Sequence, residues 1–487
     1  MDSTDKVVIL GAGPAGLTAG YELARHGIPA CILEQDKVVG GLSRTVNYKG
    51  FRFDIGGHRF YTKVREVQRV WEEILGDNFV ERDRLSRIYY RNKFFHYPLR
   101  PFNALWGLGP LESCLILLSY LRSQLFPMRP EENFEQWISN RFGRRLFRTF
   151  FKTYTEKVLG MPCTEVRAEW AAQRIKSLTL AQAITNVLFP RNGKKKITTL
   201  IDRFHYPIHG PGMLWEKLAD QLRARGQELR LQTEVVRLNH DGRRILGIEV
   251  KNARGGLEEV TGSEFISSIP MRGLIRRLDP PAPEEVCEAA ERLHYRDFLT
   301  VGVIVNRAHL FPDNWIYVHS TEVKVGRIQN YKNWHPEMAG DAAKTNLGLE
   351  YFCSRGDELW EKSDDDLKEL AKRELARLGL ARPEDCEDCI VIRVPKAYPV
   401  YDTDYARFFP AVKTYLESFS NLQCVGRNGQ HRYNSQDHSM LTALLAVRNI
   451  LGADHDLWSV DTEELNHGER EELSARLSPE AAYAKAP

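Results

Sequence analysis

Three glycines near the start of the chain are spaced for contact with a phosphate group. Gly11, Gly13 and Gly16 follow an apolar strand-like run and open a helical pattern. Glycines allow a sharp turn without side-chain bulk, so the positive N-terminal end of the following helix can approach a pyrophosphate. A second apolar run ends in Glu34, at the distance where an acid binds a ribose hydroxyl. This order of elements predicts a dinucleotide site.

The segment after this acid distinguishes between dinucleotides. Gly40-Gly41-Leu42-Ser43-Arg44-Thr45 resembles the Gly-Gly-x-x-Arg-Thr segment of FAD enzymes in the amine-oxidase and protoporphyrinogen-oxidase superfamily. In that group the Arg lies along the diphosphate and the glycines let the backbone approach the cofactor. The resemblance therefore implies FAD rather than NAD, with Gly41 and Arg44 among its contacts.

A loop with two consecutive glycines follows, at Gly56-Gly57-His58-Arg59-Phe60-Tyr61. Such a sequence is typical of backbone that lies close against a flat object. In the FAD enzymes that object is the isoalloxazine, so Gly57 and His58 are candidates for flavin contact. A tight turn with a hydrogen-bonded His is the alternative. Tyr61 replaces the second His of the loop in UDP-galactopyranose mutases, which this segment resembles.

The run Phe150–Met161 also resembles a segment of these mutases. It resembles their Phe-Phe-Lys-x-Tyr-Thr-x-Lys-x-Trp-Gly-Met segment, and Tyr154 takes the position of the tyrosine near the nucleotide. Leu159 stands where the mutases have a Trp that stacks on uracil. Because aromatic stacking contributes much of the affinity for a base, this difference argues against the usual binding mode of a UDP-sugar.

The mutase resemblance continues in the C-terminal half. Val325-Gly326-Arg327-Ile328 is similar to a segment whose Arg pairs with the donor diphosphate, and a guanidinium can hold two phosphate oxygens at once. Two further blocks place Tyr351 and Tyr433 at the phosphate-binding tyrosines. The resemblance also assigns to FAD binding the adenine-reading backbone at Val235, the glycine turn at Gly426, and Arg427 and Asp437.

The chain is longer than one compact core needs, so several domains are expected. The fold class predicted is α/β, with a Rossmann-like FAD-binding domain of the GR2 type, an inserted helical region and a mixed-sheet substrate domain. Segments 245–251, 258–260 and 264–269 are predicted to continue one small sheet. The expected parts are FAD-binding segments 1–75, 214–275 and 401–465, a helical substrate or cap region 76–213, a substrate-domain sheet 276–400 and a flexible tail 466–487.

Composition and charge restrict the partners. A net charge of +3 and 27% charged residues give no sign of a nucleic-acid-binding protein. Eight scattered cysteines and a polar start of the chain indicate reduced thiols, a cytoplasmic location and no metal site. The apolar region 102–126 is too short and broken to span a membrane. A buried helix is the default interpretation, and a peripheral membrane contact is the alternative because the end of the region carries Arg122 and Arg129.

Two reaction classes follow from the resemblance. The first is a pyranose–furanose rearrangement of a phosphorylated sugar, a nucleotide sugar or a relative, through flavin N5. Arg327 and the three tyrosines named above would hold the diphosphate, with His58 beside the flavin. The alternative is an FAD-dependent oxidoreductase that oxidises an apolar substrate, like the protoporphyrinogen and phytoene enzymes, with 102–126 lining an entry or touching a bilayer. A non-catalytic FAD scaffold is the third reading, and the oligomeric state stays open.

Overall fold

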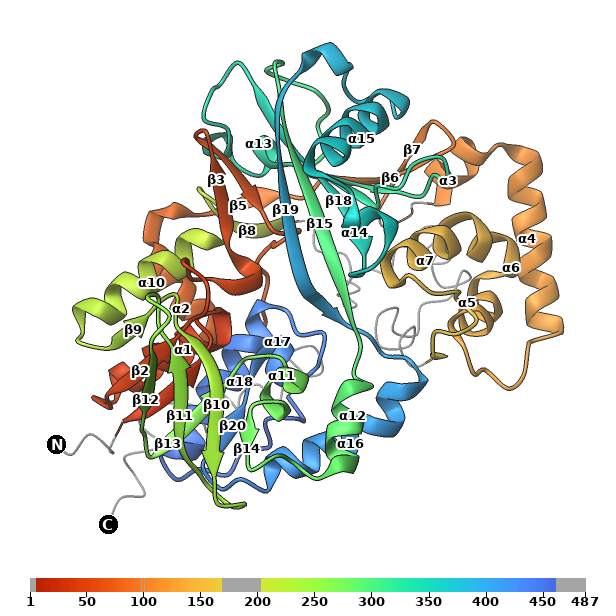
Figure 1. The fold of residues 1–487 in the computed structure, drawn as a ribbon. Helices are drawn as coiled ribbons and strands as arrows, with labels where there is room; N and C mark the ends of the chain where they lie inside the picture. The colour runs from red at the N-terminus through yellow and green to blue at the C-terminus, as the bar shows by residue number, and fades with distance from the viewer. Residues whose placement is uncertain (1–5, 98, 100, 169–202, 461–487) are drawn as a thin grey trace.

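The computed structural model describes residues 6–97, 99, 101–168 and 203–460. The predicted tail 466–487 and part of the predicted helical region, 169–202, lie outside these ranges. Figure 1 shows two sheet regions, one below the other, and a group of helices at one side of the upper region. The lower region holds the glycine turn, so it is described first.

A parallel five-stranded sheet carries the glycine turn. Its strands lie in the order β20-β13-β1-β2-β9, and each neighbouring pair is parallel. The strands are β1 (Val7–Leu10), β2 (Ala30–Leu33), β9 (Glu228–Arg230), β13 (Glu264–Ser267) and β20 (Leu422–Cys424). Because parallel strands end at the same edge, the turns that follow β1 and β20 lie at one edge although they are far apart in sequence.

Helices cover one face of this sheet, and a small sheet with further helices covers the other. Val7 and Ile9 pack among the helices of the first face, whereas Val8 and Leu10 face the small sheet, whose order is β12-β11-β10-β14. The first face is covered by α1 (Pro14–Arg25), α2 (Arg65–Leu75), α10 (Gly212–Ala224) and α18 (Gln436–Ile450). The second is covered by β10 (Glu234–His240), β11 (Ile245–Lys251), β12 (Leu257–Val260), β14 (Leu278–Asp279), α11 (Met271–Ile275), α12 (Glu284–Glu291) and α16 (Thr403–Glu417). This layering confirms the predicted α/β class.

One strand prediction is wrong. Segment 264–269 was expected in the small sheet, but β13 lies in the parallel sheet, between β1 and β20. The apolar character of Phe265 and Ile266 shows burial and does not identify the neighbouring strands. The strand returns to β1 from a distance of more than 200 residues, and such pairing cannot be read from local pattern.

The upper region is a seven-stranded mixed sheet in the order β19-β15-β18-β17-β16-β6-β7. One face packs under α15 (Asp364–Arg377), and the other packs against the hairpin β3 (Thr45–Tyr48) and β4 (Phe51–Asp54) and against β8 (Arg203–Pro207). Two of its strands, β6 and β7, come from the segment predicted as helical. The strands are β6 (Ser86–Tyr90), β7 (Lys93–His96), β15 (Tyr295–Val305), β16 (Trp315–Val318), β17 (Arg327–Asn330), β18 (Thr345–Cys353) and β19 (Cys386–Pro399).

Helices α3 to α7 form the side group in Figure 1. Their shared core includes Trp137, Phe147 and Phe150, and it joins the sheet through Ile88 and Phe95. The elements are α3 (Pro101–Leu108), α4 (Pro110–Leu125), α5 (Phe134–Phe142), α6 (Arg144–Leu146), a π-helical turn (Phe147–Lys152) and α7 (Thr153–Leu159). The expectation of a buried helix at 102–126 is wrong for α4, which exposes most of its leucines. No helix in the described part of the chain is long and apolar enough to cross a membrane.

Candidate functional site

Bare backbone lines the start of helix α1. Gly13 caps the helix, and no side chain accepts a hydrogen bond there. A Cβ on Gly16 would lie 1.8 Å from the carbonyl oxygen of Gly11, and a Cβ on Gly41 would lie 3.2 Å from the Gly13 Cα. Only glycine fits such close approaches between backbones. The helix N-terminus is therefore open to an anion, and this arrangement fits the pyrophosphate of a dinucleotide.

Glu34 lies beside this turn, at the end of β2. Its two carboxylate oxygens accept hydrogen bonds from the backbone N–H of Ala12 at 2.8 Å and of Asp36 at 2.9 Å. Burial raises the pKa of this carboxyl, although both N–H groups lower it. Arg44 forms an ion pair with Asp36. The Glu34 side chain is thus held at the turn, in the position from which a ribose hydroxyl can be bound.

The predicted adenine position, Val235, lies near Glu34 in space, but its backbone carbonyl already has a partner. The backbone N–H of Thr233, two residues before Val235, donates to the carbonyl oxygen of Glu34 at 2.8 Å. The carbonyl oxygen of Val235 accepts a hydrogen bond from Arg277 Nε at 2.5 Å. The N-terminal end of β10 therefore lies near the acid, while the backbone carbonyl of Val235 is engaged with a side chain of the protein.

The C-terminal glycine turn meets the N-terminal one. A Cβ on Gly426 would lie 2.9 Å from the Ala15 Cβ, so the residue packs directly on the first turn of α1. Its N–H donates to Thr442 Oγ1 at 3.1 Å, which ties the turn to α18. Asp437, at the start of α18, contacts Ser435 and His438. Burial raises the pKa of Asp437, but these two partners hold it below its ordinary value.

Arg427 links this turn to the upper sheet. Its Nε donates to the carbonyl oxygen of Asn434 at 2.8 Å, and its Nη1 donates to that of Ala397, at the end of β19, at 3.1 Å. The guanidinium lies 4.9 Å from the ring centre of Tyr433, which stacks on Tyr398 at 5.6 Å. The structure therefore brings the predicted residues Arg427 and Tyr433 together where the two sheet regions join.

Arg327, whose side chain is 17% exposed, forms an ion pair with the fully buried Glu350 on the face of the upper sheet that packs on β3 and β4. They are direct partners across β17 and β18, and Gln329 donates to the second carboxylate oxygen at 3.0 Å. The guanidinium carbon of Arg327 lies 3.7 Å from where a Cβ on Gly57 would stand, with Nη1 at 3.8 Å. Burial raises the pKa of Glu350, and Arg327 and Gln329 oppose this shift. Arg327 thus reaches the predicted flavin loop.

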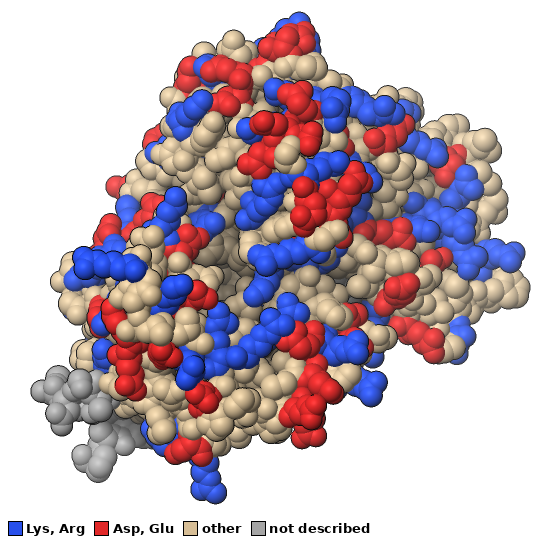
Figure 2. Space-filling view, in the orientation of Figure 1, with Lys and Arg blue, Asp and Glu red and all other residues tan. Residues whose placement is uncertain are grey.

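His58 lies in that loop between two cations. Its Nε2 donates to the carbonyl oxygen of Ile55 at 2.6 Å. Burial, together with the charges of Arg427 and Arg327, lowers the pKa of His58 to about 4. The imidazole is therefore neutral at neutral pH, and the positive charges that act on it come from Arg327 on β17 and Arg427 in the C-terminal turn. Figure 2 shows a hollow in the centre of the molecule with Lys and Arg along its margin.

Tyr154 reaches the same region from α7. Its ring stacks on His319 at 5.0 Å and meets Tyr317 edge-on at 5.4 Å, and Tyr317 is the strand partner of Arg327. Burial raises the pKa of Tyr154, and the charge of Arg327 opposes this shift. The tyrosine is therefore a neutral hydroxyl group at neutral pH. Lys157, one turn further on, donates to the carbonyl oxygens of Ser320 and Val325 and holds α7 on the strand ends.

Tyr351 is a correction to the predicted set. Its side chain is fully buried on the opposite face of β18 from Glu350, in the core under α15. Its hydroxyl donates to Glu374 at 3.1 Å. Successive side chains of a strand point to opposite faces, so Glu350 and Tyr351 cannot both face the flavin loop. The structure does not bring Tyr351 to the site.

Four site residues were missed by the sequence reasoning. They are strand neighbours of Arg327 or lie beside predicted residues, and each was passed over because its partner comes from a distant segment. Alternation along a strand could have indicated Gln329, two residues from Arg327. The described residues contain no group of His, Cys, Asp and Glu that could hold a metal ion. The missed residues are Tyr317, Gln329, Glu350 and Tyr398.

These features define a dinucleotide-binding flavoprotein fold whose parallel sheet joins a mixed sheet with buried cations. The family model described as flavin containing amine oxidoreductase matches residues 14–422, and the chain belongs to this family. FAD is therefore the cofactor, and the protein is an FAD-dependent enzyme.

Solved structures share the whole fold. A reduced UDP-galactopyranose mutase has a TM-score of 0.82 and 22% identity, covering 95% of this chain and 97% of that one. A putative protoporphyrinogen oxidase from Exiguobacterium sp. has a TM-score of 0.69 and 19% identity, covering 92% and 99%. Among curated proteins, an inactive all-trans-retinol 13,14-reductase of Danio rerio is 52% identical over 50 residues, 10% of this chain and 8% of that protein. The first four curated relatives are matched over only 8% to 22% of their length.

Proposed function

We propose that the protein rearranges a phosphorylated sugar between pyranose and furanose forms at a bound FAD. The observation that carries this proposal is the position of Arg327, whose guanidinium lies against the Gly56–Gly57 loop with Tyr154 close by. The Arg327 guanidinium is held through Nε and is only 17% exposed, and its two terminal nitrogens lie beside the loop, where they could bind two oxygens of a diphosphate. The whole-chain likeness to a UDP-galactopyranose mutase supports the same reading.

In this proposal the cofactor is held by the two glycine turns. Gly11, Gly13 and the start of α1 receive the pyrophosphate, Glu34 binds a ribose hydroxyl, and the loop at His58 receives the flavin ring. When bound, FAD supplies the reactive N5 atom. Arg427 binds the carbonyl oxygen of Ala397 on β19, so it links its own turn to the upper sheet and holds the two sheet regions together around the flavin.

The protein's own residues would then position the substrate. Arg327 holds the diphosphate and offsets its charge as it leaves the sugar, while Tyr154 and Tyr433 offer hydroxyl groups. Glu350 fixes the guanidinium through Nε, so that the terminal nitrogens face the Gly56–Gly57 loop. Leu159, in place of an aromatic ring, leaves the base without a stacking partner at that position. The substrate we propose therefore carries another base or none.

The test combines a reaction and a matched pair of variants. Dithionite-reduced protein is incubated with nucleoside diphosphate hexoses that differ in their base, and the ring size of the sugar is followed by chromatography. We expect exchange of ring forms without net redox. Arg327→Lys keeps the charge but loses the two terminal guanidinium nitrogens that can bind two phosphate oxygens at once. We therefore expect kcat/KM to fall by about tenfold or more with FAD content unchanged. Arg377→Lys, a surface ion-pair residue, is the control.

The competing function predicts a different product. An oxidoreductase acting on an apolar substrate would form hydrogen peroxide in air and would not exchange ring forms. For this function the segment 102–126 was expected to line an entry or to touch a bilayer, and the outward leucines of α4 do not line an enclosed path. Peroxide formation from an apolar substrate, together with no ring exchange, would replace the proposed function by this one.

A further inference from the structure

Helix α4 carries its large apolar side chains on its outer face. The apolar face consists of Leu111, Leu117, Leu118, Leu121, Leu125 and Phe126, all of them exposed, whereas Ser113 and Ile116 are the buried residues of the helix. Leu125 and Phe126 are each 74% exposed, and Trp106 on α3 is 92% exposed. Surface helices normally show the opposite arrangement. A continuous apolar face of this kind marks an interaction surface.

The inner side of α4 is held by polar and backbone contacts. Arg145 donates to both carboxylate oxygens of Glu112, at 2.6 Å and 2.7 Å, and its backbone N–H donates to Ser119 Oγ at 3.0 Å. A Cβ on Gly143 would lie 2.8 Å from the backbone nitrogen of Tyr120, so only glycine allows this approach. The helix is therefore fixed to its neighbours without the use of its leucines.

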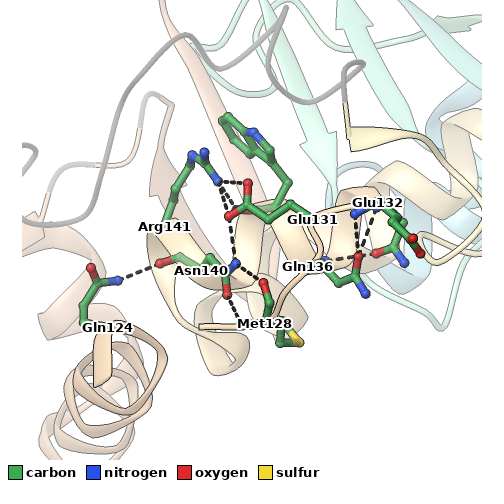
Figure 3. A network of polar contacts seen from close by, with 9 residues as sticks. Gln124, Met128, Glu131, Glu132, Gln136, Asn140 and Arg141 are labelled. Atoms are coloured by element: carbon green, nitrogen blue, oxygen red, sulfur yellow. Dashed lines mark hydrogen bonds and ion pairs between the residues drawn. The ribbon is translucent and has the colours of Figure 1, made fainter. Parts of the chain in front are cut away.

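The end of the apolar face is held equally firmly, as Figure 3 shows. Asn140 donates to the carbonyl oxygen of Met128 and accepts from its N–H, both at 2.9 Å, and the Gln124 side chain donates to the Asn140 carbonyl at 2.6 Å. Arg141 binds Glu131 at 2.9 Å and 3.0 Å. This network fixes the segment just after Phe126, so the exposed Leu125 and Phe126 stand on an ordered turn.

The charges around the apolar face have one dominant sign. Arg122, Arg129, Arg144 and Arg148 are exposed beside it. Glu112 pairs with Arg145 and Glu131 pairs with Arg141, which leaves Glu132 as a further exposed acid of this segment against the four arginines. In Figure 2 a group of Lys and Arg lies on the side region formed by these helices, next to uncharged surface. Basic residues beside an apolar helix face are suited to anionic lipid head groups.

We propose that the apolar face of α4 docks the protein on an anionic lipid surface, with the helix lying in the plane of the interface. The contact is peripheral in this proposal, because the exposed apolar side chains occupy one side of α4 and the other side packs on the protein. A second copy of the chain fits the face less well. In a two-fold interface the same patch meets itself, and the four exposed arginines would then oppose one another.

The chain itself provides the probe for this contact. Cys114 is exposed on α4, whereas the other seven cysteines are buried or partly buried. A nitrobenzoxadiazole dye attached to Cys114 becomes brighter and shifts to shorter wavelength when it enters a bilayer. We expect this change with vesicles of equimolar phosphatidylcholine and phosphatidylglycerol, and a weaker one at high salt. Sedimentation of the unlabelled protein with the same vesicles checks that the dye does not cause the binding.

Matched variants test whether vesicle binding depends on the apolar face of α4 or on any exposed leucine. Leu118→Glu with Leu125→Glu should lower vesicle affinity about tenfold or more, because two apolar contacts become charged and repelled. Leu246→Glu with Leu257→Glu, on exposed strand positions of the small sheet, should leave it unchanged. Unchanged FAD absorbance and circular dichroism show that each pair folds.

Three outcomes would overturn the proposal. The first is the absence of a dye response and of sedimentation with anionic vesicles. The second is equal binding to vesicles of phosphatidylcholine alone, which removes the role of the arginines. The third is a dye response that grows with protein concentration without lipid, which would assign the face to a second copy of the chain.

Discussion

At the scale of single residues, the pairing of Arg327 with Glu350 explains how a cation can lie inside the protein. Transfer of a guanidinium from water costs several kcal/mol unless a carboxylate and further hydrogen bonds compensate. Glu350 supplies the charge, and Gln329 satisfies its second oxygen. The pair also fixes the direction of the guanidinium. Its terminal nitrogens therefore remain directed at the loop that precedes His58.

His319, which supports Tyr154, gives a pH-dependent stability. Burial lowers the pKa of His319 to about 3, and Lys157 contributes to the shift. Between this value and an unfolded pKa of about 6.5, the unfolded state binds the proton and the folded state does not. Stability from this residue is thus present above about pH 6.5 and is lost as the pH falls. The loss should amount to about 2 kcal/mol between about pH 7 and about pH 5.

His319→Phe keeps the stacked ring and removes the titration. Urea unfolding of both proteins at the two pH values isolates the contribution of this residue, because His58 and the raised pKa of Asp54, about 7, act equally in both. The wild type should lose more stability than the variant on acidification. Equal losses would contradict the assignment.

At the scale of elements, neighbouring side chains of β18 point to opposite faces of the sheet and therefore have different roles. Glu350 faces the flavin loop, and Tyr351 faces α15, where it binds Glu374. Glu374 also accepts hydrogen bonds from the backbone N–H groups of Lys324 and Val325, just before β17. The core under α15 thus anchors the chain that delivers Arg327 to the opposite face.

Tyr351→Phe distinguishes the structural role from the predicted phosphate contact. The variant loses one buried hydrogen bond and should lower the free energy of unfolding by about 1 kcal/mol. KM for the substrate should stay unchanged, since the hydroxyl does not face the site. Tyr433→Phe, beside Arg427, is the comparison and should raise KM with little change in stability. An increase in KM for Tyr351→Phe alone would restore the original prediction.

At the scale of the whole molecule, the cofactor site is assembled from distant segments. Gly11 and Gly16 come from the start of the chain and Gly426 from its end, and β13 lies between their strands. Ligands that bind only the folded state stabilise it in proportion to the logarithm of their concentration. FAD bridges these segments in the proposed arrangement, so its effect extends to the global unfolding transition.

Removal and return of FAD should therefore shift the thermal midpoint. At a free FAD concentration about 100 times Kd, the expected stabilisation is about 2.7 kcal/mol relative to the apoprotein. Calorimetry at several FAD concentrations measures the shift, and riboflavin, which lacks the pyrophosphate, is the control. A midpoint that responds equally to riboflavin would contradict a role for the glycine turns in the binding.

How far the site could be predicted depended on the distance between its parts. The glycine turn and the acid after β2 are each encoded within a few residues and predict a dinucleotide site, and the resemblance of Gly40–Thr45 to FAD enzymes implied the cofactor class. The pairing of Arg327 with Glu350 depends on the register of β17 and β18, which no local pattern gives. Tyr351 was misplaced for the same reason, since adjacent positions of one strand belong to opposite faces.

The sequence by itself determined the cofactor class, the α/β architecture and the residue types that could meet an anion, because these depend on backbone turns and hydrogen-bonding groups that are local. The tertiary structure decided which face of each strand meets the flavin loop, where β13 lies and which side of α4 is exposed. These features depend on contacts between segments far apart in the chain. Burial and strand pairing select among them only when the whole core has formed.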